Sequence, residues 1–180
     1  MCCFVALLAA GPIVCSQAAA FPVPRDTFRD ALARGDIVRL EAAMHRVFAE
    51  TPTREEIEQI EGEMLKFPQL AIEPRHYFAE GLYAREILIP AGALLTGIIH
   101  RTETLNVVSH GEMIVWTPHG TRRVKGPCTF VSGPGVKRIG IALTACLWTA
   151  INANPANLRD LGALDEFLLF NPQQPEKPTT

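Results

Sequence analysis

The stretch that decides the fold reads Gly92-Ala-Leu-Leu-Thr-Gly-Ile98-Ile-His100-Arg-Thr-Glu-Thr104-Leu-Asn-Val-Val-Ser-His-Gly111. It holds two short apolar runs, one around Leu95 and one around Val107, each bounded by glycine or by a polar turn. Short runs of aliphatic and β-branched residues between such turns are typical of β-strands. The stretch therefore predicts two consecutive strands joined by a turn at residues 101–103.

The same two-residue period extends in both directions from this stretch, starting at Tyr83 and ending at Ile151. Side chains that alternate between two environments are expected when one face of a sheet is buried. Short strands at this spacing predict a mainly β protein built on a single small barrel or jelly roll. The expected strands are Tyr83–Ile89, Leu95–His100, Thr104–Ser109, Glu112–Thr117, Thr121–Lys125, Cys128–Val131, Lys137–Ala142 and Leu147–Ile151.

Helical patterns flank this region on both sides. Apolar residues recur at helical spacing from Asp26 to Phe48, and Gly35 is a candidate point of division. Thr53 and Glu56 form a capping-box pattern that starts a second helix. The expected organisation is an apolar leader at 1–24, a helical arm at 25–68, a barrel at 69–152, a C-terminal helix at 153–170 and a disordered tail at 171–180.

The N-terminal leader leaves two alternatives open. Residues 1–20 contain an apolar run followed by small residues, as a secretory signal does, but no Lys or Arg precedes the run. Alternatively, Met44 is the natural start. We expect a cytoplasmic or virion-associated protein, or a secreted one if residues 1–20 are a signal peptide. The run is too short to span a membrane.

The charge balance limits the partners. Lys and Arg number 17 against 19 Asp and Glu, which gives a net charge of −2. A protein that binds nucleic acid through its phosphates needs a clear basic excess, so no nucleic-acid partner is expected. The sequence also contains no phosphate loop and no nucleophile elbow. It therefore assigns no catalytic residue.

Two motifs resemble those of the cupin superfamily, whose fold is a double-stranded β-helix. The stretch quoted above resembles the first cupin motif, with Gly92, Gly111 and His100 at the expected places. The run Gly126-Pro-Cys-Thr-Phe-Val-Ser-Gly133-Pro134-Gly135-Val-Lys-Arg138-Ile-Gly-Ile-Ala142 resembles the second motif, with one additional residue after its first glycine. The resemblance implies a single cupin or jelly-roll β-barrel.

The resemblance also shows where a cupin binds its metal, and most of the ligands are replaced here. Ile98 stands at the position of the first His, Thr104 at that of the Glu, and Arg138 at that of the His in the second motif. Only His100 is kept. Isoleucine cannot ligate a metal, and arginine remains positively charged. The resemblance therefore implies a degenerate metal site, and no cofactor is expected.

Three functions remain open. The first is a non-catalytic binding or structural subunit. A loose resemblance to small cupin-like proteins of tailed phages and prophages would extend this reading to a phage or prophage accessory protein. The second is a metal-dependent oxygenase or isomerase that uses His100 and Glu103 to hold Fe, Mn, Zn or Ni. The third is a small-anion sensor with Arg138 in the barrel, since guanidinium groups suit carboxylates. The expected ligand-binding residues are His100, Thr104, Asn106 and Arg138.

The expected partner is a second copy of the chain. Cupins commonly pair through outer strands, so the resemblance implies a homo-oligomer formed through the barrel strands. The N-terminal helices would supply further interface.

Overall fold

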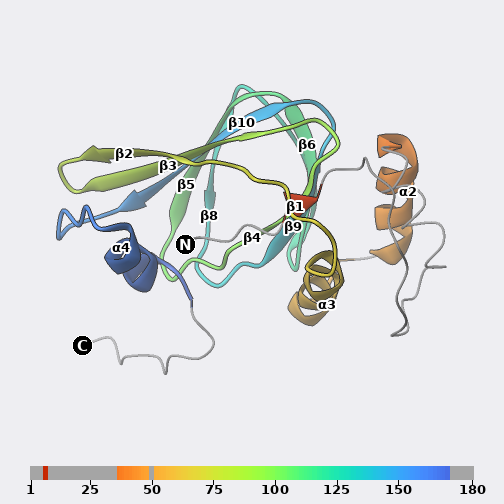
Figure 1. The fold of residues 1–180 in the computed structure, drawn as a ribbon, viewed down its shortest axis with the longest axis horizontal. Coiled ribbons are helices and arrows are strands. Elements are labelled where there is room, and N and C mark those ends of the chain that lie inside the picture. The colour runs from red at the N-terminus through yellow and green to blue at the C-terminus, as the bar shows by residue number, and fades with distance from the viewer. Residues whose placement is uncertain (1–5, 8–35, 49–50, 171–180) are drawn as a thin grey trace.

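The computed structural model describes residues 6–7, 36–48 and 51–170. These residues form two antiparallel sheets that face each other, with helices at the sides (Figure 1). The strands are β1 (Ala6–Leu7), β2 (Arg75–Ala79), β3 (Leu82–Ile89), β4 (Leu94–Gly97), β5 (Thr104–His110), β6 (Glu112–Thr117), β7 (Gly120–Lys125), β8 (Cys128–Ser132), β9 (Arg138–Ala142) and β10 (Cys146–Ala153). The helices are α2 (Ile37–Val47), α3 (Arg54–Met64) and α4 (Leu161–Leu168).

The strand order defines the fold. The first sheet has the order β1-β4-β9-β6-β7, and the second has the order β2-β3-β10-β5-β8. Strands from the start and the end of the barrel sequence therefore alternate within each sheet, as two interleaved Greek keys require. This is the jelly-roll arrangement, and it confirms the predicted mainly β fold with N-terminal and C-terminal helices.

All the predicted strands are present, most of them with shifted ends. The largest difference is in β4, which ends at Gly97, so that His100 forms only an isolated bridge with Leu169. The sequence reading missed β2, which it took for an extended connector. This strand lies at the edge of its sheet, and its inner residues are only half-buried, so the alternation between buried and exposed residues is weak there.

Helices α2 and α3 cover the outer face of the first sheet (Figure 1). Asp36 caps α2, and Thr53 with Glu56 forms the predicted capping box of α3. The part of the predicted first helix before Asp36 lies outside the described residues. The apolar stripes of both helices and the sheet share one core: Leu40, Met44, Phe48, Ile57, Ile60, Met64, Leu94, Ile114, Trp116, Ile139 and Ile141. The helical arm is therefore part of the domain.

A second apolar cluster fills the space between the sheets at one end of the barrel. Its members alternate along their strands with residues that face outward, as the two-residue period requires. They include Ile87, Ile89, Leu95, Val108, Met113, Val115, Val124, Ala142, Cys146 and Trp148.

At the other end, α4 packs against β3. Leu164 and Leu168 are buried on Tyr83, and the chain after the helix pairs its backbone with residues 99–101. No helix among the described residues has the length and apolar character needed to cross a membrane. The predicted disordered tail at 171–180 and most of the predicted leader lie outside those residues.

Candidate ligand-binding cavity

A cavity lies between the sheets, next to the end that α4 covers. The free space inside this cavity is about 70 Å³. This is room for about five water molecules, or for a ligand of similar size. The lining residues come from both sheets and from the segment after β4: Arg85, Ile87, Ile89, Leu95, Gly97, Ile98, His100, Asn106, Met113, Val115, Arg138, Gly140, Trp148, Ala150 and Asn152.

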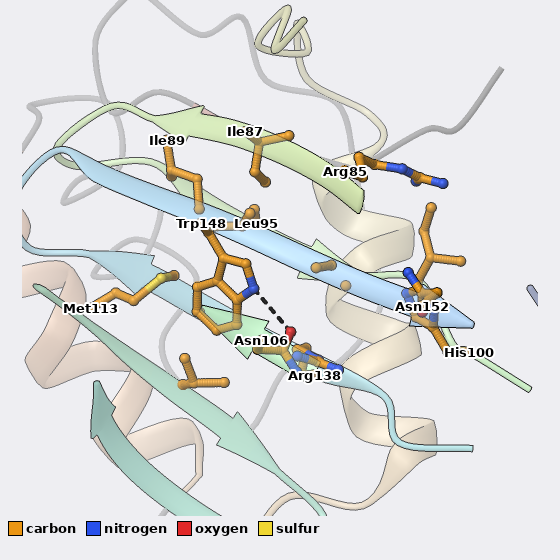
Figure 2. Close-up of a pocket in the computed structure, with 15 residues that line it drawn as sticks. Arg85, Ile87, Ile89, Leu95, His100, Asn106, Met113, Arg138, Trp148 and Asn152 are labelled. Carbon is orange, nitrogen blue, oxygen red and sulfur yellow. Dashed lines mark hydrogen bonds between the residues drawn. The ribbon is translucent and has the colours of Figure 1, made fainter. Parts of the chain in front are cut away.

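The cavity is polar at one end and apolar at the other. Figure 2 shows Ile89 and Met113 on one side and Arg85, His100 and Asn152 on the other. The inward-facing residues of β3 explain this gradient, because Arg85, Ile87 and Ile89 follow one another at two-residue steps. The polar end lies nearest to α4.

Arg138 is the central cation of the site. It lies on the inward phase of β9 opposite Gly97, and a Cβ atom at position 97 would come within 2.6 Å of its Cγ atom. The side chain is partly buried and lines two adjoining cavities. Burial lowers the pKa of its guanidinium. Within the described part of the chain, no carboxylate lies within ion-pairing distance of Arg138.

The second arginine, Arg85, is already paired. It is 6% exposed, and its Nη2 atom donates to Asp165 Oδ1 on α4 at 3.1 Å. Its Nε atom donates to the hydroxyl of Tyr83 at 3.2 Å. Asp165 thus pairs with Arg85, whereas Arg138 has no such carboxylate among the described residues.

His100 supplies a neutral imidazole. Desolvation by burial, followed by the positive charges of Arg138 and Arg85, lowers its pKa to about 4, although a hydrogen bond with Asn152 and the charge of Asp165 oppose the shift. Its buried Nδ1 atom has no hydrogen-bond partner among the described residues. A buried polar atom of this kind calls for a partner.

Asn106 orients its neighbours. Its Oδ1 atom accepts a hydrogen bond from Trp148 Nε1 at 3.0 Å, drawn in Figure 2. Its Nδ2 atom donates to the backbone oxygen of Thr104 at 3.0 Å and to Ser132 Oγ at 2.9 Å. Both amide protons are therefore in use, so the residue holds Trp148 in place instead of donating to a ligand.

Thr104 lies behind the cavity wall. It is 1% exposed, and its hydroxyl donates to Asn152 Oδ1 at 2.8 Å. Of the four expected ligand-binding residues, the structure places His100, Asn106 and Arg138 in the lining, and Thr104 supports Asn152 from outside it.

The donor set does not fit a metal ion. Glu103 is exposed in the bend before β5 and does not line the cavity, so the structure does not bring it together with His100 there. No group of three or more His, Cys, Asp or Glu side chains gathers anywhere in the described ranges. A single imidazole beside the Arg138 guanidinium lacks the anionic or neutral ligand set that transition metals require.

A second cavity of about 230 Å³ adjoins the first between the edge strands β7 and β8. Val115, Arg138 and Trp148 line both. At the rim, the Arg122 guanidinium lies 5.2 Å from the centroid of the Phe130 ring. Arg138 therefore stands between the inner cavity and the side of the barrel.

Three residues of the cavity lining were not predicted from the sequence: Arg85, Trp148 and Asn152. A signal for Arg85 was present, since it shares the inward phase of β3 with Tyr83 and Ile87. A charged residue on the buried phase of a strand indicates either a partner or a binding role. Asn152 stands beyond the predicted end of its strand at Ile151, so its inward position was not foreseen.

Comparisons with known proteins agree on the fold alone. No family model and no curated protein matches the chain. Similar solved structures include a cupin-like protein from Thermotoga maritima (12% identity, 46% of this chain and 68% of that chain, TM-score 0.40) and an RmlC-like cupin from Shewanella frigidimarina (18%, 51% and 80%, TM-score 0.42). A third is KdgF from Halomonas sp. (17%, 46% and 79%, TM-score 0.40). The jelly-roll assignment rests on the strand order of the chain itself.

Proposed function

We propose that this protein is a non-catalytic binding barrel that takes a small anion in its inner cavity. The observation that carries the proposal is Arg138, a cation that lines the cavity and has no ion-pair partner among the described residues. A charge removed from water without a partner is costly, and an anionic ligand would compensate it. Guanidinium groups bind carboxylates and similar anions through paired N–H donors.

The charges of the cavity favour a monoanion. Asp165 balances Arg85, and His100 is neutral at pH 7 because its pKa is about 4. Among the described residues, Arg138 is then the lining cation that no carboxylate pairs with. A ligand with one negative charge would make the occupied cavity neutral.

The alternative is a metal-dependent cupin enzyme that uses His100 and Glu103. The lining does not support it, because Glu103 is exposed outside the cavity and Arg138 would repel a bound cation. Metal analysis of protein purified without chelator, beside a His100→Ala variant, separates the two proposals. Near-stoichiometric metal that disappears in the variant would favour the enzyme.

Calorimetric titration with acetate, butyrate, chloride and phosphate tests the binding proposal. We expect at least one of these anions to bind wild-type protein and to bind Arg138→Gln at least tenfold more weakly. Arg123→Gln is the matched control, because it removes one positive charge on β7 outside both cavities. Equal affinity of wild type and Arg138→Gln for every anion would disprove the proposal, as would the absence of binding.

We also propose that the protein forms a homodimer through the outer face of the second sheet. Large apolar side chains are exposed there, among them Leu88 at 58%, Leu105 at 41% and Val131 at 58%. The charges on the face are already paired, since Arg75 and Tyr77 both contact Glu86. Exposed apolar patches of this kind mark interaction sites.

The dimensions of this face suit a second copy. Five strands spaced about 4.8 Å apart, each five to eight residues long, make a face of about 500 Å² in projection. This is of the order of the roughly 800 Å² that each partner buries in a standard interface. The first sheet offers no such face, because α2 and α3 cover it. A role as a phage or prophage accessory protein stays a prediction from the sequence.

A further inference from the structure

We infer that the ligand is a short-chain monocarboxylic acid of about three or four carbons, with its carboxylate at Arg138 and its tail at the apolar end of the cavity. This inference rests on the proposed anion-binding function and names its ligand class. It follows from the contrast between the polar end and the apolar end of the cavity, and not from the charge of Arg138 alone.

The apolar end lacks donors for a fully oxygenated anion. Beyond Arg138, the lining toward Ile89 consists of aliphatic and thioether side chains together with Trp148, whose only N–H is already donated to Asn106. Phosphate and sulfate need donors on every side, because unpaired oxygens lose their hydration without compensation. A carboxylate needs donors on one side only, and its alkyl chain gains from apolar contact.

Small residues create the space that the tail would occupy. Gly140 and Ala150 both line the cavity, the first between Arg138 and Ala142 on β9 and the second on β10. A Cβ atom at position 140 would come within 2.9 Å of Met113 Cε. The free space therefore continues from the guanidinium toward Ile87, Leu95 and Met113, and it does not end at the charge.

The size of the cavity sets the length of the acid. A space for about five water molecules accommodates about five or six non-hydrogen atoms. Propionate and butyrate contain that number, whereas octanoate exceeds it.

Calorimetric titration with a homologous series tests the inference: acetate, propionate, butyrate, hexanoate and octanoate, with inorganic phosphate as the oxygenated anion. We expect affinity to rise about fourfold with each methylene up to butyrate and to fall at octanoate. Arg138→Gln should lower the affinity for every acid at least tenfold. The same protein should bind phosphate more weakly than butyrate.

Two variants in the cavity wall around the alkyl tail of the acid make the test specific for the cavity. Ile87→Val removes one methyl group from the apolar end and should favour the next longer acid over butyrate. Val115→Leu adds one and should favour propionate over butyrate. Neither residue contacts the guanidinium charge by hydrogen bonding, and both changes are small enough to preserve folding.

The outcomes separate this inference from the proposed function. Phosphate binding that depends on Arg138, together with no increase in affinity from acetate to butyrate, would overturn the ligand class and keep the anion site. A length dependence that Arg138→Gln does not change would overturn both, as would an absence of binding by all six compounds. Unaltered length preference in both cavity-wall variants would also overturn the ligand class.

Discussion

Arg138 passes directly over Gly97 on the neighbouring strand. The two residues are register partners in β9 and β4, and a Cβ atom at position 97 would lie 2.6 Å from Arg138 Cγ and 3.0 Å from Cδ. A contact this short forces the side chain to move. The place of the guanidinium in the cavity therefore depends on the absence of a side chain on its neighbour.

Gly97→Ala should weaken anion binding without removing any charge. We expect about a tenfold loss of affinity, measured by calorimetric titration, because the guanidinium shifts away from its present position. Gly62→Ala is the control, since a Cβ atom there would meet nothing within 4 Å beyond its chain neighbours and the backbone of its own helix, and alanine suits a helix. Unchanged affinity in Gly97→Ala would show that Arg138 does not hold the ligand from this position.

The two cavity arginines should differ in their effect on stability. Without ligand, Arg138→Gln should unfold at the same or a higher urea concentration than wild type, with a gain of up to about 1 kcal/mol, because an unpaired charge leaves the interior. Arg85→Gln should instead cost about 3 kcal/mol, since it removes the buried cation that pairs with Asp165. A large loss of stability in Arg138→Gln would mean that this charge is compensated within the protein.

His100 should make the protein less stable in mild acid. Its pKa is about 4 in the folded protein and about 6.5 in the unfolded chain, so only the unfolded chain takes up its proton between these values. Its contribution to stability is complete above pH 6.5 and declines as the pH falls toward 4, by about 3 kcal/mol in total.

Urea unfolding at several pH values checks this contribution. The difference in unfolding free energy between wild type and His100→Asn should change across pH 4–6.5 and stay constant above it. An NMR titration of the imidazole in the folded protein gives its pKa directly. An imidazole that titrates near 6.5 would contradict the prediction.

Much of the barrel could be predicted because its turns are marked in the sequence. The glycines and prolines that bound the strands allowed β6 to be placed at Glu112–Thr117, as observed. The alternating pattern is weak at β2, whose inner face is only half-buried, and it ends early at β4, where His100 forms a bridge only with Leu169, a residue far along the chain. Such long-range pairing leaves no local signal.

The candidate site could be predicted only in part, for a similar reason. The motif resemblance located His100 and Arg138, since both stand at motif positions. It could not show that Arg85 joins them, because this depends on the pairing of β3 with β10 and on Asp165 from α4. It also placed Thr104 in the lining, whereas the structure turns its hydroxyl to Asn152.

The exposed face of the second sheet should carry the dimer contact. Leu105 and Val131 are register partners on β5 and β8, so replacing both with lysine places two like charges at one point of the face. Light scattering coupled to size-exclusion chromatography should give a dimer for wild type and a monomer for the double variant. Val38→Lys changes an apolar residue that is 74% exposed on α2 and should leave the dimer intact. A monomeric wild type would refute the homodimer.

The helical arm should be anchored to the sheet by Glu61 and Lys137. Lys137 Nζ donates to the two carboxylate oxygens of Glu61 at 2.7 and 2.8 Å, and Lys137 is 6% exposed. Removing one partner of a buried ion pair leaves the other charge buried without a partner. Lys137→Met and Glu61→Leu should therefore each lower the free energy of unfolding by about 3 kcal/mol. The double variant leaves no unpaired charge, so its loss of unfolding free energy should be well below the sum of the two single losses.

A double-mutant cycle from urea unfolding measures this coupling, which we expect to exceed about 1.5 kcal/mol. The control is the pair formed by Glu63, in the last turn of α3, and Lys66, which lies just after the helix. It is solvent-exposed at Lys66, and such pairs contribute less than about 1 kcal/mol. Because Lys137 directly precedes Arg138, the anchor also fixes the start of β9, so Lys137→Met should weaken anion binding while Lys66→Met should not. Equal coupling in the two cycles would show that the arm is held by apolar packing alone.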